Sequence, residues 1–266
     1  MLEKQIREQI ISLINREVVP AVGCTEPMCV SLCVAKATET LGCRPEKITA
    51  LLSANILKNA MGVGIPGTGM IGLPIAIALG ALVGKSEYQL EVIKDLTRET
   101  LEEGKQYVNE DHIDIKLKQG ITEKLYVEIR CEAQGHEATA IIAQSHTNIV
   151  YVERDGNAIL DRRTPQAGAA EQKDIQLNMR MVYDFAMTTP EEEISFILKT
   201  RDYNIRAAEE SKKANYGHCL GKTIDRPLSH GIFGNSIFSH IISKTASACD
   251  ARMGGAMIPV MSNSGS

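Results

Sequence analysis

The sequence predicts an α+β protein, in which a mainly helical domain is interrupted by an inserted α+β domain with an antiparallel sheet of about four strands. Three observations support this. Apolar residues recur about every 3.6 residues near both ends of the chain. They alternate with a period of 2 over residues 113–152. Aromatic residues make up only 4% of the chain, which suits closely packed helices. We place the helical domain at 1–85 and 188–266, incomplete at its C-terminus, and the insertion at 86–187.

The first helices are indicated by apolar stripes and by the residues that interrupt them. A stripe that begins at Leu2 predicts a helix, which Pro20 and Gly23 separate from the next. The second helix begins near Thr25 and ends before Gly42. Further helices are expected at 48–60, where a strand is the alternative, at 71–84 after a glycine-rich turn, and at 86–107.

The expected strands lie where the spacing of apolar residues changes from about 3.6 to 2. The expected strands are short and rich in apolar and β-branched residues, and glycines mark the turns between them. The four strands are expected at 113–117, 125–129, 138–142 and 149–152. The helical period returns from residue 174, and the last part of the chain, 229–266, is rich in small residues.

Composition excludes several classes of protein. A formal charge of −4 argues against a nucleic-acid partner. Residues 59–84 carry no charge, but their seven glycines and two prolines argue against a membrane span, so we expect no membrane partner. Seven cysteines, an odd number, without a signal peptide argue against a disulfide framework and favour the cytoplasm.

The glycine-rich turn matches the spacing of a dinucleotide-binding loop. Gly62, Gly64 and Gly67 follow the pattern G-x-G-x-x-G, as do Gly67, Gly69 and Gly72. That pattern binds a dinucleotide only between a strand and a helix, whereas a helix is expected before this turn. We therefore interpret it as a sharp turn whose free amides can still receive an anion.

Cys24 is the candidate reactive residue. It lies in the sequence Gly-Cys-Thr-Glu-Pro, before the helix that begins near Thr25. A helix N-terminus stabilises a thiolate, so we expect the pKa of Cys24 to lie below that of a free thiol, and a buried structural thiol is the alternative. Cys29 and Cys33 share one helix face and are expected in the core. The histidines of the strand region, His112, His136 and His146, are expected at the surface or in turns.

Two polar stretches lie in apolar surroundings. Lys58 and Asn59 precede the glycine-rich turn, and residues 262–266 read Ser-Asn-Ser-Gly-Ser. Burying polar groups costs free energy unless they are paired. They therefore indicate either backbone capping or a site for a small anion such as a carboxylate.

Four motifs together resemble one family. They are PAVGCTEP at 20–27, ILKNAMGVGIPGTG at 56–69, SHTNI at 145–149 and ASACDARMGGAMIPVMSNSGS at 246–266. In these motifs, and over essentially its whole length, the chain is similar to the L-cysteine desulfidase family, which is related to the iron–sulfur L-serine dehydratase alpha chain. The resemblance implies that the helical part is catalytic and that the α+β part is an insertion.

The resemblance also implies a reaction. It is the β-elimination of L-cysteine to sulfide, ammonia and pyruvate, in which a [4Fe–4S] cluster offers one open iron as a Lewis acid for the leaving group. Cys24 matches the base that removes the Cα proton. The residues expected to bind the amino-acid substrate are Thr25, Glu26, Lys58, Asn59, Gly67, Thr68, Ser262, Asn263, Ser264 and Ser266.

The sequence departs from the family at its end. The family's cluster cysteines lie beyond the serine-rich loop, whereas this chain stops inside that loop, and none of its seven cysteines matches a cluster ligand. We therefore expect the cluster in a longer protein and neither cluster nor turnover in this chain alone. L-serine deamination on the same scaffold and a non-catalytic small-molecule-binding protein are the alternatives. We expect a homo-oligomer.

Overall fold

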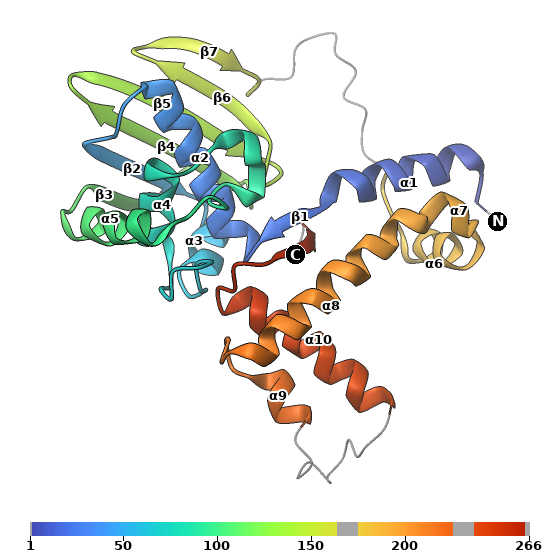
Figure 1. The fold of residues 1–266 in the computed structure, drawn as a ribbon. Helices are drawn as coiled ribbons and strands as arrows, with labels where there is room; N and C mark the ends of the chain where they lie inside the picture. The colour runs from blue at the N-terminus through green and yellow to red at the C-terminus, as the bar shows by residue number, and fades with distance from the viewer. Residues whose placement is uncertain (1, 164–174, 226–236, 264–266) are drawn as a thin grey trace.

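The computed structural model describes residues 2–163, 175–225 and 237–263 and confirms an α+β fold with antiparallel strand pairing (Figure 1). Its α-helices are α1 (Lys4–Glu17), α2 (Thr25–Leu41), α3 (Ala54–Ala60), α4 (Leu73–Leu82), α5 (Arg98–Asn109), α6 (Met179–Thr188), α7 (Glu191–Ile194), α8 (Leu198–Lys213), α9 (Leu220–Asp225) and α10 (Ile237–Met253). Two short 3₁₀ helices are η1 (Ser86–Glu91) and η2 (Ser195–Ile197). The strands are β1 (Val18–Val22), β2 (Lys47–Leu52), β3 (Ile113–Leu117), β4 (Tyr126–Ala133), β5 (His136–Ala143), β6 (Ile149–Arg154), β7 (Asn157–Asp161) and β8 (Pro259–Asn263).

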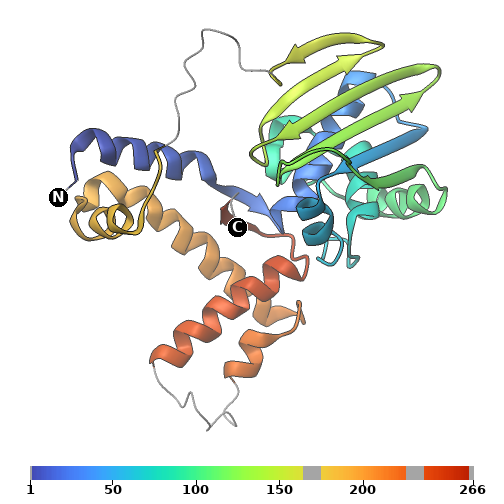
Figure 2. The same ribbon diagram turned by 180° about the vertical axis from the view of Figure 1, so that it is seen from behind.

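Six strands form one sheet in the order β3-β2-β4-β5-β6-β7. The pair β2–β3 is parallel, and the other neighbours in this sheet are antiparallel. The four predicted strands are present as β3 to β6, and β2 and β7 extend the sheet. A separate ladder pairs β1 with β8, so residues near the two ends of the chain lie side by side (Figure 2).

The prediction of one helix over residues 48–60 is wrong for its first half. Ile48, Ala50 and Leu52 are buried and alternate with less buried residues, which is the period of a strand. As part of β2, Ile48 and Ala50 pair with Cys131 and Ile129 of β4. The helix is confined to α3, because the sheet offers β2 hydrogen-bond partners on both sides.

The predicted domain boundary at residue 85 cuts through the six-stranded sheet and the helices that cover it. β2 comes from the part assigned to the helical domain, yet it lies between β3 and β4. Helices α2 and α4, from the same part, cover one face of the sheet (Figure 1). The sheet therefore uses residues from both sides of that boundary, and residues 86–187 are not a separate unit.

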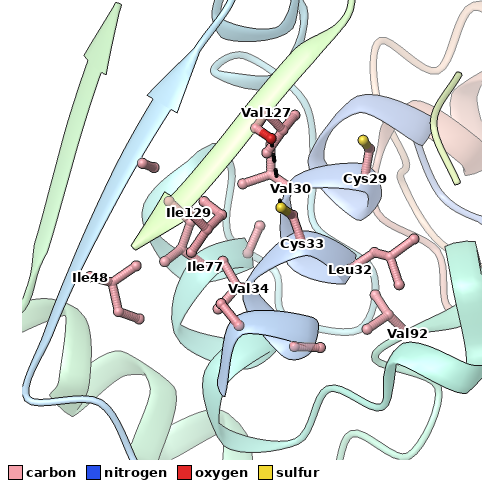
Figure 3. Packing of buried hydrophobic residues seen from close by; sticks show 14 of the residues in the cluster. Cys29, Val30, Leu32, Cys33, Val34, Ile48, Ile77, Val92, Val127 and Ile129 are labelled. Carbon is pink, nitrogen blue, oxygen red and sulfur yellow. Dashed lines mark hydrogen bonds between the residues drawn. The ribbon is translucent and has the colours of Figure 1, made fainter. Parts of the chain in front are cut away.

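Helix α2 is the centre of the core. It packs against α4, β4 and β5, and almost all of its length is buried (Figure 3). Cys29 and Cys33 are fully buried, which confirms the prediction of core residues. The Cys33 thiol lies 3.3 Å from the carbonyl oxygen of Ala140, so the helix touches the backbone of the sheet directly.

The predicted helix over 86–107 is interrupted. Residues 86–91 form η1, and Gln89 inside it has φ of +50°. Helix α5 begins only after Thr97, whose hydroxyl accepts a hydrogen bond from the amide of Thr100. This capping box gives α5 its own start and separates it from η1.

The remaining helices form a second group. Arg7 of α1 donates two hydrogen bonds to the carboxylate of Glu193 in α7, at 2.8 and 2.9 Å. Helices α8 and α10 pack against each other, and α9 packs against α10 (Figure 2). Within the described residues, every helix is too short or too polar to cross a bilayer.

Candidate functional site

The candidate site is built at the N-terminus of α2. Strand β1 leads into Gly23, which has φ of +75°. A Cβ at this position would also lie 2.5 Å from Cγ of Pro66, so only glycine fits. Cys24 is the N-cap residue of α2 in an extended conformation, which agrees with the predicted helix start. Cys24, Thr25 and Glu26 are 5%, 0% and 6% exposed, so the three side chains lie beneath the surface.

The carboxylate of Glu26 contacts three other predicted site residues. Its Oε2 atom accepts hydrogen bonds from the Cys24 thiol at 2.9 Å and from the Thr25 hydroxyl at 3.1 Å. Its Oε1 atom accepts one from the amide nitrogen of Asn59 at 3.2 Å. Asn59 is exposed near the end of α3, whereas the carboxylate that it contacts is buried. We call these four residues, Cys24, Thr25, Glu26 and Asn59, the Glu26 cluster.

The expectation of an acidic Cys24 thiol is wrong. Burial raises its pKa to about 12, and the hydrogen bond to Glu26 and the negative charge of that carboxylate act in the same direction. The positive charge of Arg252 opposes this only in part. The favourable effect of the helix N-terminus is therefore outweighed, and Cys24 is a neutral thiol at neutral pH.

Glu26 is the ionised member of the pair. Burial favours its protonated form, but hydrogen bonds from Cys24, from its own amide and from Asn59, together with the charge of His146, outweigh this. The pKa of Glu26 therefore lies below its ordinary value. The resting site contains a thiol that donates a hydrogen bond to a carboxylate, in surroundings where most water is excluded.

Two further residues at the site were not recognised as site residues from the sequence. His146, expected at the surface or in a turn, is only 3% exposed between β5 and β6, and its charge acts on Glu26. Arg252, near the end of α10, donates from Nε to the carbonyl oxygen of Gly23 at 3.2 Å. Both lie in motifs that carry the family resemblance, SHTNI and ASACDARMGG, which was the available signal.

The glycine-rich turn is hydrogen-bonded to the residues at the end of α10. The amide of Gly64 donates to the carbonyl oxygen of Met253 at 3.0 Å, and that of Gly67 donates to Gly255 at 2.9 Å. The Thr68 hydroxyl donates to the carbonyl oxygen of Ile65 at 2.7 Å and accepts from the amide of Met70. These polar groups of Gly67 and Thr68 are thus engaged within the protein. The turn follows helix α3, which is not the setting of a dinucleotide-binding loop.

The other predicted substrate-binding residues are placed only in part. Lys58 is exposed on α3, next to Asn59. The backbone of β8 pairs Ser262 with Val19 and Asn263 with Val18, which brings this strand beside β1, the strand that leads to Cys24. Ser264 and Ser266 lie outside the described residues.

The described residues do not fit a [4Fe–4S] cluster. Such a cluster needs converging thiolates. Across the described ranges, no three side chains of the kinds His, Cys, Asp and Glu gather in a way that could hold a metal ion. Cys29 and Cys33 lie in the apolar core, where burial raises the pKa of both thiols. These two thiols are therefore not placed to act as cluster ligands.

Comparison with known proteins gives relatives but no activity. The chain is 62% identical over 260 residues to a protein of Bacteroides fragilis named UPF0597 protein, and the match covers 98% of this chain and 61% of that protein. Proteins of the same name from Phocaeicola vulgatus and Chromobacterium violaceum are 64% and 42% identical over 267 and 273 residues, in each case 100% of this chain and 62% of that protein. The chain thus spans about three fifths of the length of these relatives. No family model matches it, and no solved structure matches it.

Proposed function

We propose that this chain carries the proton-transfer part of an L-cysteine desulfidase, a lyase that converts L-cysteine to sulfide, ammonia and pyruvate. The resemblance of the four sequence motifs suggests the reaction. The observation that supports it is the buried contact between the Cys24 thiol and the Glu26 carboxylate, 2.9 Å apart. A thiol whose proton is already hydrogen-bonded to an ionised acceptor is suited to proton transfer.

The pKa values place the resting proton on Cys24 and leave Glu26 as the ionised acceptor. Cys24 has a pKa of about 12 and carries its proton at neutral pH. It can accept the Cα proton of the substrate only as it passes its own proton to Glu26. In this relay one proton leaves Cα and one arrives at Oε2 of Glu26, and Cys24 is a thiol before and after.

Electrons move in one direction through the substrate. The pair of the broken Cα–H bond forms the second bond between Cα and Cβ, and the pair of the Cβ–S bond leaves with sulfide. The product, aminoacrylate, is hydrolysed to ammonia and pyruvate. A cluster bound by ligands outside the described residues would supply Lewis-acid assistance to the leaving group.

Asn59 is the member of the Glu26 cluster that a small amino-acid ligand can reach from solvent. It is exposed at the end of α3, and its amide contacts the buried carboxylate of Glu26. The cysteines of the described residues are all free, which agrees with a cytoplasmic location for the enzyme.

The test uses the protein expressed from its complete gene, reconstituted anaerobically with iron and sulfide. We expect equimolar sulfide and pyruvate from L-cysteine, and a loss of at least about 100-fold in kcat in Cys24→Ala. Cys43→Ala, which changes a cysteine outside the Glu26 cluster, should retain activity. Turnover of L-serine without turnover of L-cysteine would assign the serine dehydratase alternative. Turnover of neither amino acid would reject the proposal.

A further inference from the structure

A groove lies between α8 and α10, with residues of β8 beside it. It has a volume of about 590 Å³, and its lining combines aliphatic side chains with charged and polar ones. Ile205 and Ala208 come from α8, Ile241 and Ala248 from α10, and Val260 from β8. The Glu26 cluster is not part of this groove.

The lining residues follow the spacing of helix faces. On α8, Arg201, Ile205, Ala208 and Lys212 are three or four residues apart. On α10, Ile241, Thr245, Ala248 and Arg252 repeat the same spacing. Each helix thus turns one stripe into the groove, and two such stripes side by side form the surface on which a third helix packs.

These stripes contain large apolar side chains that the described residues leave open. Ile205 is 45% exposed and Ile241 is 56% exposed. Exposed apolar patches of this kind mark interaction surfaces.

Charge indicates what kind of helix fits. Four residues that line the groove are basic and one is acidic; they are Arg201, Lys212, Lys244, Arg252 and Glu209. A helix with an apolar stripe flanked by acidic side chains would match both the aliphatic and the basic residues of the groove.

We propose that an acidic amphipathic helix binds in the groove. This helix corresponds to polypeptide that the relatives carry outside the region matched by this chain. The matches to the Bacteroides fragilis and Phocaeicola vulgatus proteins use 98% and 100% of this chain but only 61% and 62% of those proteins. About two fifths of each relative is therefore available to cover the groove.

The position of Arg252 connects the groove to the Glu26 cluster. Its side chain lines the groove, and its Nε atom donates to the carbonyl oxygen of Gly23, the residue before Cys24. A helix seated on α8 and α10 would contact the guanidinium that supports the backbone at Cys24.

The labelling rate of Cys249 reports whether the groove is covered. It lines the groove and is exposed, whereas Cys131 is fully buried in the sheet. In the protein expressed from its complete gene, we expect iodoacetamide to label Cys249 at least tenfold more slowly than in the same protein carrying Ile241→Glu, which places a charge in the apolar floor. Lys244→Glu should also speed labelling, because it repels an acidic segment. Protection of Cys131 in every variant shows that the fold is intact.

Ile159→Glu is the matched control, because Ile159 is 65% exposed on β7, away from the groove. It should leave the labelling of Cys249 unchanged. Fast labelling of Cys249 in the unmodified protein would overturn the proposal. Protection that disappears on hundredfold dilution would show that a second copy of the chain occupies the groove, and would also overturn it.

Discussion

At the N-terminus of α2, burial and the carboxylate of Glu26 together keep the Cys24 thiol protonated. The pKa of Cys24 rises from 9.0 to about 12, which corresponds to about 4 kcal/mol. A helix terminus contributes only about 0.3–1 kcal/mol to the stability of a nearby charge. Burial and the adjacent charge of Glu26 have the greater effect, and they therefore keep the proton on sulfur.

Removing the charge of Glu26 should make Cys24 more reactive. In Glu26→Gln, the negative charge that raises the pKa of the thiol is lost, so that pKa falls towards the ordinary value. We expect the alkylation rate of Cys24 at pH 9 to rise about tenfold, measured by mass spectrometry. Glu39→Gln, near the other end of α2, should leave the rate unchanged. An equal rate in the Glu26→Gln and unmodified proteins would mean that burial alone controls Cys24.

Glu26 should also make stability depend on pH. Its pKa in the folded protein lies below the unfolded value, so its contribution is fully present above the unfolded pKa and is lost as pH falls through the folded pKa. The free energy of unfolding should therefore fall less between pH 6 and pH 3 in Glu26→Gln than in the unmodified protein. Urea titrations at several pH values measure this, and parallel pH profiles for the two proteins would contradict it.

Sequence reasoning found part of this site for a physical reason. Cys24, Thr25 and Glu26 are neighbours in the chain, so a helix start at Thr25 is sufficient to place them together. His146 and Arg252 reach the same place through the packing of distant elements. No local pattern reveals that packing, and the resemblance of their motifs was the one sequence signal that could have identified them.

At the scale of elements, the glycine-rich turn packs closely against the end of α10. The sequence predicts a turn at residues 62–72, which the structure confirms. The partner of this turn is not predictable, because it comes from residues 253–255, almost two hundred positions later. The strand β2 escapes prediction for a related reason: six alternating residues directly before a helix are ambiguous until the flanking strands provide hydrogen-bond partners.

A substitution at Gly64 tests this contact between the turn and the end of α10. A Cβ at this position would lie 2.7 Å from the carbonyl carbon of Gly254, which is backbone and cannot rotate away. We expect Gly64→Ala to lower the free energy of unfolding by about 2 kcal/mol, measured by chemical denaturation. Gly62→Ala is the matched control, since a Cβ there has no atom within 4 Å. Equal stability of the two variants would show that the turn does not dock closely on α10.

At the scale of the whole molecule, the sheet joins parts of the chain that composition separates. The change of period near residue 110 is real, but it marks a change of secondary structure and not the border of a folding unit. Helices with a period of about 3.6 residues lie on the sheet itself, because both α2 and α4 bury their apolar sides against it or against each other.

An excised segment 86–187 should therefore fail to fold. Among the described residues β3 pairs only with β2, which the segment lacks, and β4 would lose its partner on one side. The face of the sheet that α2 covers would be open to water, including Val127, Ile129 and Ala140, which are fully buried in the intact chain. We expect far-ultraviolet circular dichroism to show little sheet and heating to give no cooperative transition. A segment of residues 18–163, which keeps β2, α2 and α4, should unfold cooperatively. A cooperative transition in the shorter segment would restore the division at residue 85, because it would mean that the strands after it carry enough core of their own.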